Sequence, residues 1–290
     1  MGGPVTPPGP GGRFGARLAE AVALHGPVCV GIDPHASLLA AWGLDDDVAG
    51  LERFSRTVVE ALAGRVAALK PQAAFFERHG SRGVAVLETV IAEARAAGTL
   101  TIVDAKRGDI GSTMQAYADA FCGDSPLAGD AVTVSPYLGF GSLRPVLDTA
   151  AATGRGVFVL ALTSNPEGAQ VQHATGGDGR SVARAVAEAA AAENAGATPL
   201  GDVGLVVGAT TGTAAREAGI DLAAVNGPLL APGVGAQGAT AGDLRDVFGD
   251  ALPAVLAASS RDVLRAGPDV VALREAAERT AAQCRAALGS

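Results

Sequence analysis

The chain has 290 residues, of which 48% are hydrophobic, and a formal net charge of −8 at pH 7. This length exceeds the usual ~100–200 residues of one domain, although α/β barrels often reach it as a single unit. The acidic balance argues against a general nucleic-acid-binding protein, which usually carries a basic patch. Cys29, Cys122 and Cys284 lack the spacing of a zinc site, and their small, odd number favours a reduced, cytoplasmic protein.

The N-terminal segment, residues 1–12 (MGGPVTPPGPGG), is too rich in glycine and proline to pack, and we expect it to form a disordered tail. It has neither the basic stretch nor the apolar stretch of a secretory signal peptide. No apolar run in the chain reaches the ~18 residues that a membrane-spanning helix needs. We therefore expect a soluble protein of the cytoplasm whose single folded domain covers residues 13–290.

Residues 13–25 predict a helix rich in alanine and leucine, and from there short apolar runs alternate with loops and alanine-rich helical stretches. Eight runs are predicted to be β-strands, at residues 28–33, 66–70, 100–106, 131–137, 156–164, 204–210, 229–235 and 254–260. Nearly continuous apolar strands that alternate with helices indicate a parallel sheet covered by helices. Eight such units in roughly 250 residues predict an α/β fold of the TIM (β/α)8 barrel type, with a doubly wound open sheet as the alternative.

Polar side chains stand at the ends of most of these strands, where the active site of a TIM barrel is built. They are Asp33, Lys70, Asp104, Lys106, Ser135, Ser164, Thr210 and Arg261. If these residues only ended strands, turn formers such as glycine, asparagine and proline should dominate, so the charged types favour a shared polar site. Residues 165–180, after the fifth strand, are long, polar and glycine-rich, which fits either a lid over a ligand or a mobile surface loop.

The third strand ends in four charged residues within six positions, namely Asp104, Lys106, Arg107 and Asp109. Side chains two apart on a strand share a face, so we expect Asp104 and Lys106 to lie side by side. Two carboxylates and an ammonium group at a strand end can polarise a substrate and move a proton. The alternative is a structural ion pair, with Asp109 as the cap of the following helix.

Residues 232–238 (PGVGAQG) follow the seventh strand and contain the spacing G-x-G-x-x-G. They do not predict a dinucleotide site, because only one strand follows and the acidic residue expected ~20 positions on is missing. In a TIM barrel, the loops after strands seven and eight commonly bind phosphate. Glycines such as Gly235 let backbone N–H groups approach an anion, and Gln237 and Arg261 can donate hydrogen bonds to it. The alternative is a tight turn, with Arg261 paired to a surface carboxylate.

Residues 104–113 (DAKRGDIGST) resemble the D-x-K-x-x-D-I-x-x-T signature of the orotidine 5′-phosphate decarboxylase family. The resemblance is closest to the longer, bacterial branch. It extends to residues 31–34 (GIDP), 69–72 (LKPQ), 135–139 (SPYLG), 162–166 (LTSNP) and 232–238. One departure is Ser260, which stands before the arginine where the family often has glycine.

The resemblance implies a cofactor-free enzyme of pyrimidine biosynthesis that converts orotidine 5′-phosphate to UMP and CO2. It implies that Lys106 protonates C6 of the pyrimidine and that Asp104 faces the leaving carboxylate. Asp33 and Lys70 would hold the ribose hydroxyls, and Lys70 would also complete a charged network with Asp104 and Lys106. No metal is implied, and the four scattered histidines of the chain do not predict a zinc site.

For the rest of the substrate, the resemblance implies that Ser164 binds the pyrimidine and that Gln237 and Arg261 bind the 5′-phosphate. It also implies a homodimer in which Asp109 and Thr113 enter the active site of the partner. Two other functions stay open. One is a magnesium-dependent sugar-phosphate decarboxylase or aldolase, which shares D-x-K-x-x-D but needs another acidic ligand. The other is a barrel that binds a phosphorylated metabolite without catalysis, which should have lost the lysine or the acids.

Overall fold

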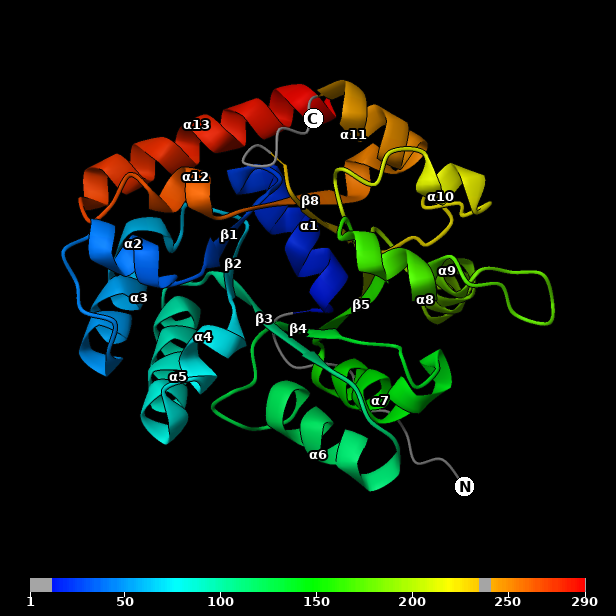
Figure 1. Ribbon diagram of the computed structural model, residues 1–290, viewed down its shortest axis with the longest axis horizontal. Helices are drawn as coiled ribbons and strands as arrows, with labels where there is room; N and C mark the ends of the chain where they lie inside the picture. Colours follow the sequence, from blue (N-terminus) through cyan, green and yellow to red (C-terminus); the bar gives the residue numbers. More distant parts are fainter. Residues whose placement is uncertain (1–11, 235–240, 290) are drawn as a thin grey trace.

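The computed structural model describes residues 12–234 and 241–289, so nearly all of the expected disordered tail, residues 1–12, lies outside the described residues. Eight parallel strands, hydrogen-bonded in chain order, close into a barrel (Figure 1). The strands are β1 Val28–Ile32, β2 Ala68–Pro71, β3 Leu100–Arg107, β4 Ala131–Val134, β5 Gly156–Leu162, β6 Val203–Val207, β7 Leu229–Pro232 and β8 Val255–Ser259. The prediction of a TIM barrel is confirmed, and the open-sheet alternative is wrong.

Each predicted strand overlaps an observed one, but several strands end earlier than the sequence suggests. β4 ends at Val134 and β5 at Leu162, so Ser135 and Ser164 lie in the loops that follow the sheet. Both loops reach a proline within a few residues, Pro136 and Pro166. Since proline has no N–H to donate, it cannot extend the hydrogen-bonded ladder.

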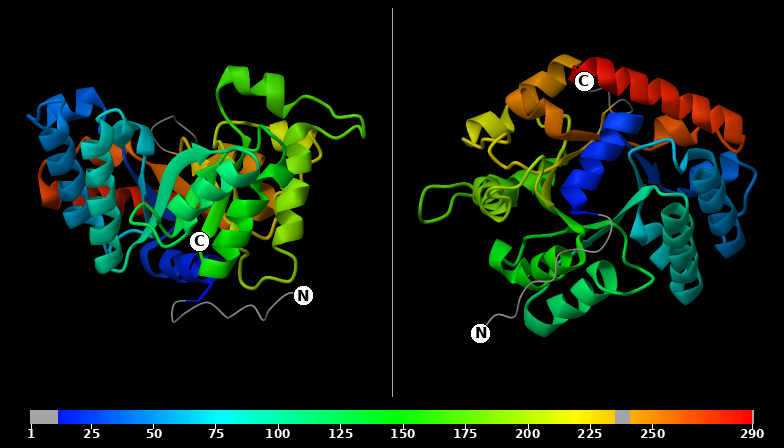
Figure 2. Two further views of the ribbon diagram at one scale, coloured as in Figure 1. Left: turned by 90° about the horizontal axis from the view of Figure 1, so that it is seen from below. Right: turned by 180° about the vertical axis from the view of Figure 1, so that it is seen from behind.

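Helices surround the barrel on its outer side (Figures 1 and 2). The α-helices are α1 Phe14–His25, α2 Ala36–Ala41, α3 Val48–Leu62, α4 Ala73–Glu77, α5 Gly80–Ala96, α6 Gly111–Cys122, α7 Arg144–Thr153, α8 Ala169–Gln172, α9 Val182–Glu193, α10 Ala214–Glu217, α11 Ala241–Phe248, α12 Arg261–Leu264 and α13 Val270–Leu288. The 3₁₀ helices are η1 Phe140–Leu143, η2 Pro166–Gly168 and η3 Gly249–Ala254. Within the described ranges, no helix is both long enough and apolar enough to cross a membrane.

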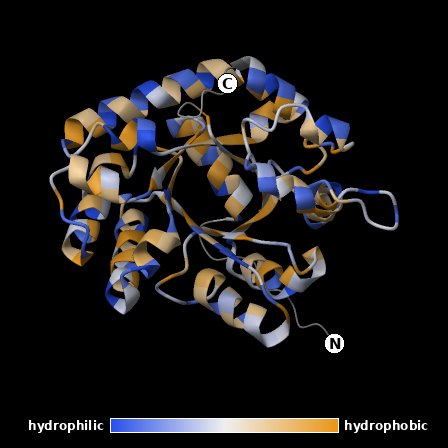
Figure 3. Cartoon of the chain, in the orientation of Figure 1, coloured by the Kyte–Doolittle hydropathy of each residue, from blue (hydrophilic) through white to orange (hydrophobic). Residues whose placement is uncertain are grey.

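The strands bury apolar side chains on both faces, as a parallel sheet under helices requires. On β1, Val28, Val30 and Ile32 belong to the large cluster between strands and helices, whereas Cys29 belongs to a second cluster inside the barrel. Figure 3 shows the result, with largely hydrophobic strands and helices of mixed character. Burial on two faces therefore explains why the strands read as continuous apolar runs.

The expected helix at residues 13–25 is α1, which lies across one end of the barrel (Figures 1 and 2). Phe14 and Leu18 of α1 pack into the interior cluster, and the Phe14 ring meets the Phe158 ring edge-on with centroids 5.8 Å apart. Gly156 begins β5 against this ring, since a Cβ there would lie 2.2 Å from Phe14. α1 therefore closes the end of the barrel where the strands begin and leaves the opposite end for a site.

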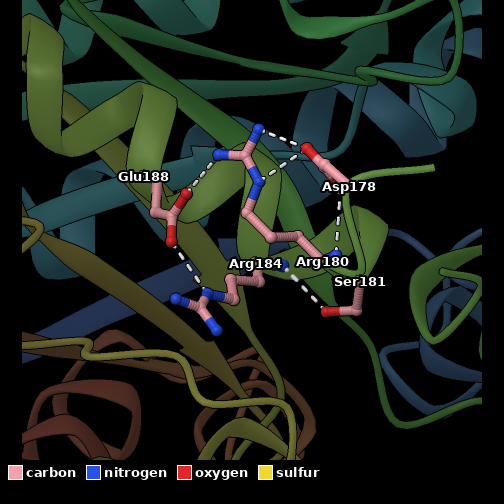
Figure 4. Close-up of polar contacts among 5 residues, drawn as sticks. All are labelled: Asp178, Arg180, Ser181, Arg184 and Glu188. Atoms are coloured by element: carbon pink, nitrogen blue, oxygen red, sulfur yellow. Dashed lines mark hydrogen bonds and ion pairs between the residues drawn. The ribbon is translucent and has the colours of Figure 1, made fainter. Parts of the chain in front are cut away.

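Residues 165–180, expected to be a long loop, contain η2, α8 and a hairpin that projects from the barrel (Figure 2). Within the hairpin Thr175 pairs with Ser181 as an antiparallel bridge. Figure 4 shows how the hairpin is tied to α9: Arg180 bonds both Asp178 and Glu188. This segment therefore has regular structure of its own.

Candidate active site

A cavity of about 490 Å³ opens at the carboxyl ends of the strands, opposite α1. This volume lies within the range of about 300–1,000 Å³ that is usual for small-molecule sites. Six of the predicted site residues line it: Asp33, Lys70, Asp104, Lys106, Ser164 and Arg261. The predicted phosphate ligands Gly235 and Gln237 lie outside the described residues. Six of the eight polar residues expected at strand ends therefore share one cavity.

Two lysines and an aspartate from the neighbouring strands β2 and β3 form a charged cluster in this cavity. Lys70 Nζ lies 2.8 Å from Asp104 Oδ2, and Lys106 Nζ lies 2.5 Å from Asp104 Oδ1. The side chains of Lys70 and Asp104 are each 9% exposed, whereas that of Lys106 is 43% exposed. One ammonium group is therefore buried, and the other is accessible from the cavity. The predicted pair of Asp104 and Lys106 is present, and it faces the cavity.

Asp104 and Lys70 hold their charges firmly at neutral pH. Burial alone would raise the pKa of the Asp104 carboxyl, but the charges and hydrogen bonds of Lys70 and Lys106 lower it well below its usual range. Burial alone would likewise lower the pKa of the Lys70 ammonium, but the charges of Asp104 and Asp33 outweigh burial and raise it. Asp104 is therefore a carboxylate that fixes two ammonium groups.

β3 bulges at the point where it carries Lys106. Val103 pairs with Val132 of β4, and the next pair joins Arg107 to Val134, so four steps along β3 match two along β4. Lys106 lies in the bulge with φ of 47°, in the left-handed region. For a residue other than glycine such a conformation costs about 1–3 kcal/mol, and it is commonly found at functional sites. The bulge therefore sets where the ammonium group of Lys106 points.

Arg107 anchors the chain directly after Lys106. Its guanidinium pairs with Glu77 and lies 5.6 Å from the ring centroid of Tyr117 and 5.4 Å from that of Phe121. These contacts lie on α4 and α6, outside the barrel, so Arg107 points away from the cavity that Lys106 faces. The charged run at the end of β3 is thus divided between the active site and the surrounding helices.

Three oxygens in or beside the cavity lack protein partners among the described residues. They are Asp33 Oδ1, Ser259 Oγ and Ser260 Oγ, all buried. Buried polar groups are nearly always hydrogen-bonded, so such oxygens indicate groups that a polar ligand would satisfy. Leu160, Leu162 and Val206 supply an apolar part of the same cavity. The site therefore combines an apolar surface with polar groups suited to a ligand rich in hydroxyls.

Asp109 and Thr113 are placed differently from the other predicted residues, because they do not belong to the lining of this cavity within the described part of the chain. Asp109 accepts a hydrogen bond from the N–H of Ile110, and Ile110 is the residue that precedes α6 as its N-cap. The alternative in which Asp109 caps the helix is therefore wrong. Thr113 lines a separate groove of about 310 Å³ beside α6, together with Tyr117.

Some strand-end candidates miss the site, and other residues were overlooked. Ser135 and Thr210 are not part of the cavity lining as far as the chain is described. Gln72 lines the cavity after β2 and was not assigned a role. Thr133 of β4 donates to Asp104 Oδ1 at 2.8 Å and was also missed. The signal in the sequence for Thr133 was that it is a polar residue within the otherwise apolar run of β4.

Comparisons with known proteins show the family of the chain. Residues 26–276 match the model of the "Orotidine 5'-phosphate decarboxylase / HUMPS family". Proteins named orotidine 5'-phosphate decarboxylase from Salinispora arenicola and Streptomyces coelicolor are 69% and 66% identical over 276 residues, which is 95% of this chain and 98% of each relative.

Solved structures extend the similarity to three dimensions. A crystal structure from Streptomyces avermitilis is 62% identical and has a TM-score of 0.93 over all of both chains. The Leishmania donovani OMP decarboxylase is 31% identical and has a TM-score of 0.72, covering 96% of this chain and 99% of that one. The chain belongs to the orotidine 5'-phosphate decarboxylase / HUMPS family.

Proposed function

We propose that this protein decarboxylates orotidine 5′-phosphate to UMP and CO2 and so acts as a carboxy-lyase of pyrimidine biosynthesis. The observation that carries the proposal is the ammonium group of Lys106, held by a buried carboxylate at the wall of a ligand-sized cavity. Relatives that are 66–69% identical over nearly the whole chain bear the name of this enzyme.

The chemistry needs a cation at one carbon. The bond between C6 and the carboxylate breaks, CO2 leaves, and the electron pair stays on C6 of the pyrimidine, which cannot delocalise it well. An ammonium group ~4 Å from a unit negative charge interacts with it by about 4 kcal/mol at an effective dielectric of 20. Because Asp104 already fixes Lys106, little reorganisation is needed as the charge develops. Lys106 then transfers a proton to C6 and regains one from solvent.

Other residues of the cavity bind the rest of the substrate. Asp33, whose Oδ1 is buried without a partner among the described residues, accepts from a ribose hydroxyl, and Lys70 donates to the ribose while it neutralises Asp104. Asp104 faces the carboxylate that leaves, and Ser164 binds the pyrimidine. At the far side, Arg261 pairs with the 5′-phosphate, together with Gly235 and Gln237 of the seventh loop. Phosphate binding far from C6 can supply energy for orienting the substrate.

The active enzyme is a homodimer in which Asp109 and Thr113 complete the site of the partner. Supporting this, neither residue lines the cavity of its own chain over the described residues. Ile110, 61% exposed, and Tyr137, 76% exposed, follow β3 and β4, and these loops are in contact where Gly108 meets Ser135. Exposed apolar side chains on two loops in contact support a protein–protein contact at this edge.

Incubation of the purified protein with orotidine 5′-phosphate and EDTA tests the proposal. We expect the pyrimidine absorbance to change as UMP and CO2 form in equal amounts, at the same rate with and without the chelator. A metal-dependent relative would instead lose activity in EDTA and act on a sugar phosphate such as 3-keto-gulonate 6-phosphate. Both oxygens of Asp104 already bind ammonium groups, which supports the metal-independent reaction. Absence of UMP would contradict the proposal.

The cellular location follows from the pathway rather than from the fold. We place the enzyme in the cytoplasm, where the sequence predicts it. Its three cysteines are free and buried, as a reducing compartment would leave them.

A further inference from the structure

We infer that Thr133 is a positioning residue, whose hydroxyl sets the backbone and the ammonium group of Lys106 for proton transfer. The inference rests on the proposed function, since it concerns how the proton donor of that reaction is held. Thr133 lies in the middle of β4 and is 1% exposed. It does not line the cavity in the described part of the chain, so it acts through other residues rather than on the substrate.

The bulge in β3 creates the need for such a residue. Between the pairs Val103↔Val132 and Arg107↔Val134, β4 supplies only Thr133 to face the bulged residues. A backbone N–H in a regular ladder bonds to a backbone carbonyl, but the N–H of Lys106 donates to Thr133 Oγ1 at 3.0 Å. The hydroxyl of Thr133 thus replaces a backbone hydrogen bond of the sheet at Lys106, the residue with the left-handed backbone.

The same hydroxyl also binds the carboxylate that holds the ammonium group. Thr133 Oγ1 donates to Asp104 Oδ1 at 2.8 Å, and Oδ1 receives Lys106 Nζ at 2.5 Å. The backbone N–H and the side-chain ammonium of Lys106 are therefore linked to each other through Thr133 and Asp104. A hydroxyl suits this place because it donates one hydrogen bond while it accepts another.

The side chain faces the interior of the barrel, where water is not available to replace it. Thr133 pairs with Phe158 of β5, and Phe158 belongs to the interior cluster. If the hydroxyl is removed without a change in the size of the side chain, the N–H of Lys106 loses its hydrogen-bond acceptor. Asp104 Oδ1 then also loses one of its hydrogen-bond donors. Because these groups are buried next to the reacting lysine, the effect should fall on the chemical step.

The variant Thr133→Val tests this inference, because valine has the shape of threonine without the hydroxyl. We expect kcat for orotidine 5′-phosphate to fall by about 10- to 100-fold, as for loss of a hydrogen bond to a charged group. KM and the Kd for UMP should stay within about threefold, since neither substrate nor product touches Thr133. Thr133→Ser, which keeps the hydroxyl, should restore kcat to within about threefold of the unmodified protein.

Thr101→Val is the matched control. Thr101 is also buried in the barrel sheet, 1% exposed, but its hydroxyl has no hydrogen-bond partner among the described residues. This variant should keep the kinetics of the unmodified protein. If Thr133→Val does not fold, as judged by thermal denaturation, Thr133→Cys takes its place, because a thiol is a weak hydrogen-bonding group of similar size.

The outcomes separate this inference from the proposed function. An unmodified protein that makes no UMP would contradict the proposed function itself. An active unmodified protein together with unchanged kcat in Thr133→Val would overturn the positioning role. Equal losses of kcat in Thr133→Val and Thr133→Ser would also overturn it, because packing rather than the hydroxyl would then be responsible.

Discussion

At the scale of single residues, the site depends on one buried carboxylate with two cationic partners. Asp104 binds Lys70 and Lys106 through different oxygens. Removing one member of such a buried group of charges strongly destabilises the folded protein, because the remaining charges are left without a partner of opposite sign. The pairing of residues two apart on a strand was predictable from the sequence. The bulge at Lys106 was not, because no glycine marks a left-handed backbone at that position.

Asp104→Asn should therefore lower both activity and stability. We expect the free energy of unfolding at pH 7 to fall by about 3 kcal/mol, because two ammonium groups lose their carboxylate. Urea denaturation of both proteins measures the difference.

The pH dependence follows from the lowered pKa of Asp104. The folded pKa lies below the value of 3.8 for an unperturbed aspartate, so the carboxylate contributes its full stability above pH 3.8 and loses it as the pH falls through the folded pKa. The difference between the two proteins should stay constant from about pH 5 to 7 and shrink below about pH 4. A difference that vanishes already at neutral pH would contradict the buried ion cluster.

At the scale of elements, the barrel is closed at one end and opens into the cavity at the other. The helix α1 fills the end where the strands begin, and the cavity occupies the end where they finish. The existence of α1 was predicted from its composition, but its position was not, because packing of Phe14 on Phe158 joins residues far apart in the chain.

Phe14→Ala should separate stability from catalysis. Removing a fully buried aromatic side chain costs about 3–5 kcal/mol, so we expect a clearly lower Tm. KM should stay within about twofold, because the substituted ring lies at the opposite end from the cavity. Leu24→Ala, on the same helix but 75% exposed, is the control and should leave both quantities unchanged. A large rise in KM without loss of stability would contradict this division of the barrel.

At the scale of the whole molecule, the count of strands and their order were predictable, because strands buried on both faces give continuous apolar runs separated by helices. The ends of the strands were harder to predict. Ser135 and Thr210 were expected at strand ends, but both lie past their strands and outside the cavity lining, as far as the chain is described. The position of Asp109 relative to the substrate also cannot be derived from a single chain, because in the proposed dimer Asp109 enters the active site of the partner.

Mixing of inactive variants tests the dimer. Lys106→Ala and Asp109→Ala, combined under conditions of subunit exchange, should recover roughly a quarter of the unmodified activity, because half of the dimers are mixed and each has one complete site. The pair Lys106→Ala and Asp104→Asn is the control, and it should recover none, because both residues come from the same chain's cavity. No recovery in the first mixture after verified exchange would mean that Asp109 serves its own chain.

The central claim is that the Lys106 ammonium stabilises and protonates C6, and turnover by Lys106→Ala tests it most directly. The variant should fold, with circular dichroism like that of the unmodified protein, and should still bind UMP. Its kcat for orotidine 5′-phosphate should fall at least about 10³-fold, because both the proton donor and the fixed cation are lost. A folded Lys106→Ala protein that keeps more than about a tenth of the unmodified kcat would contradict the account.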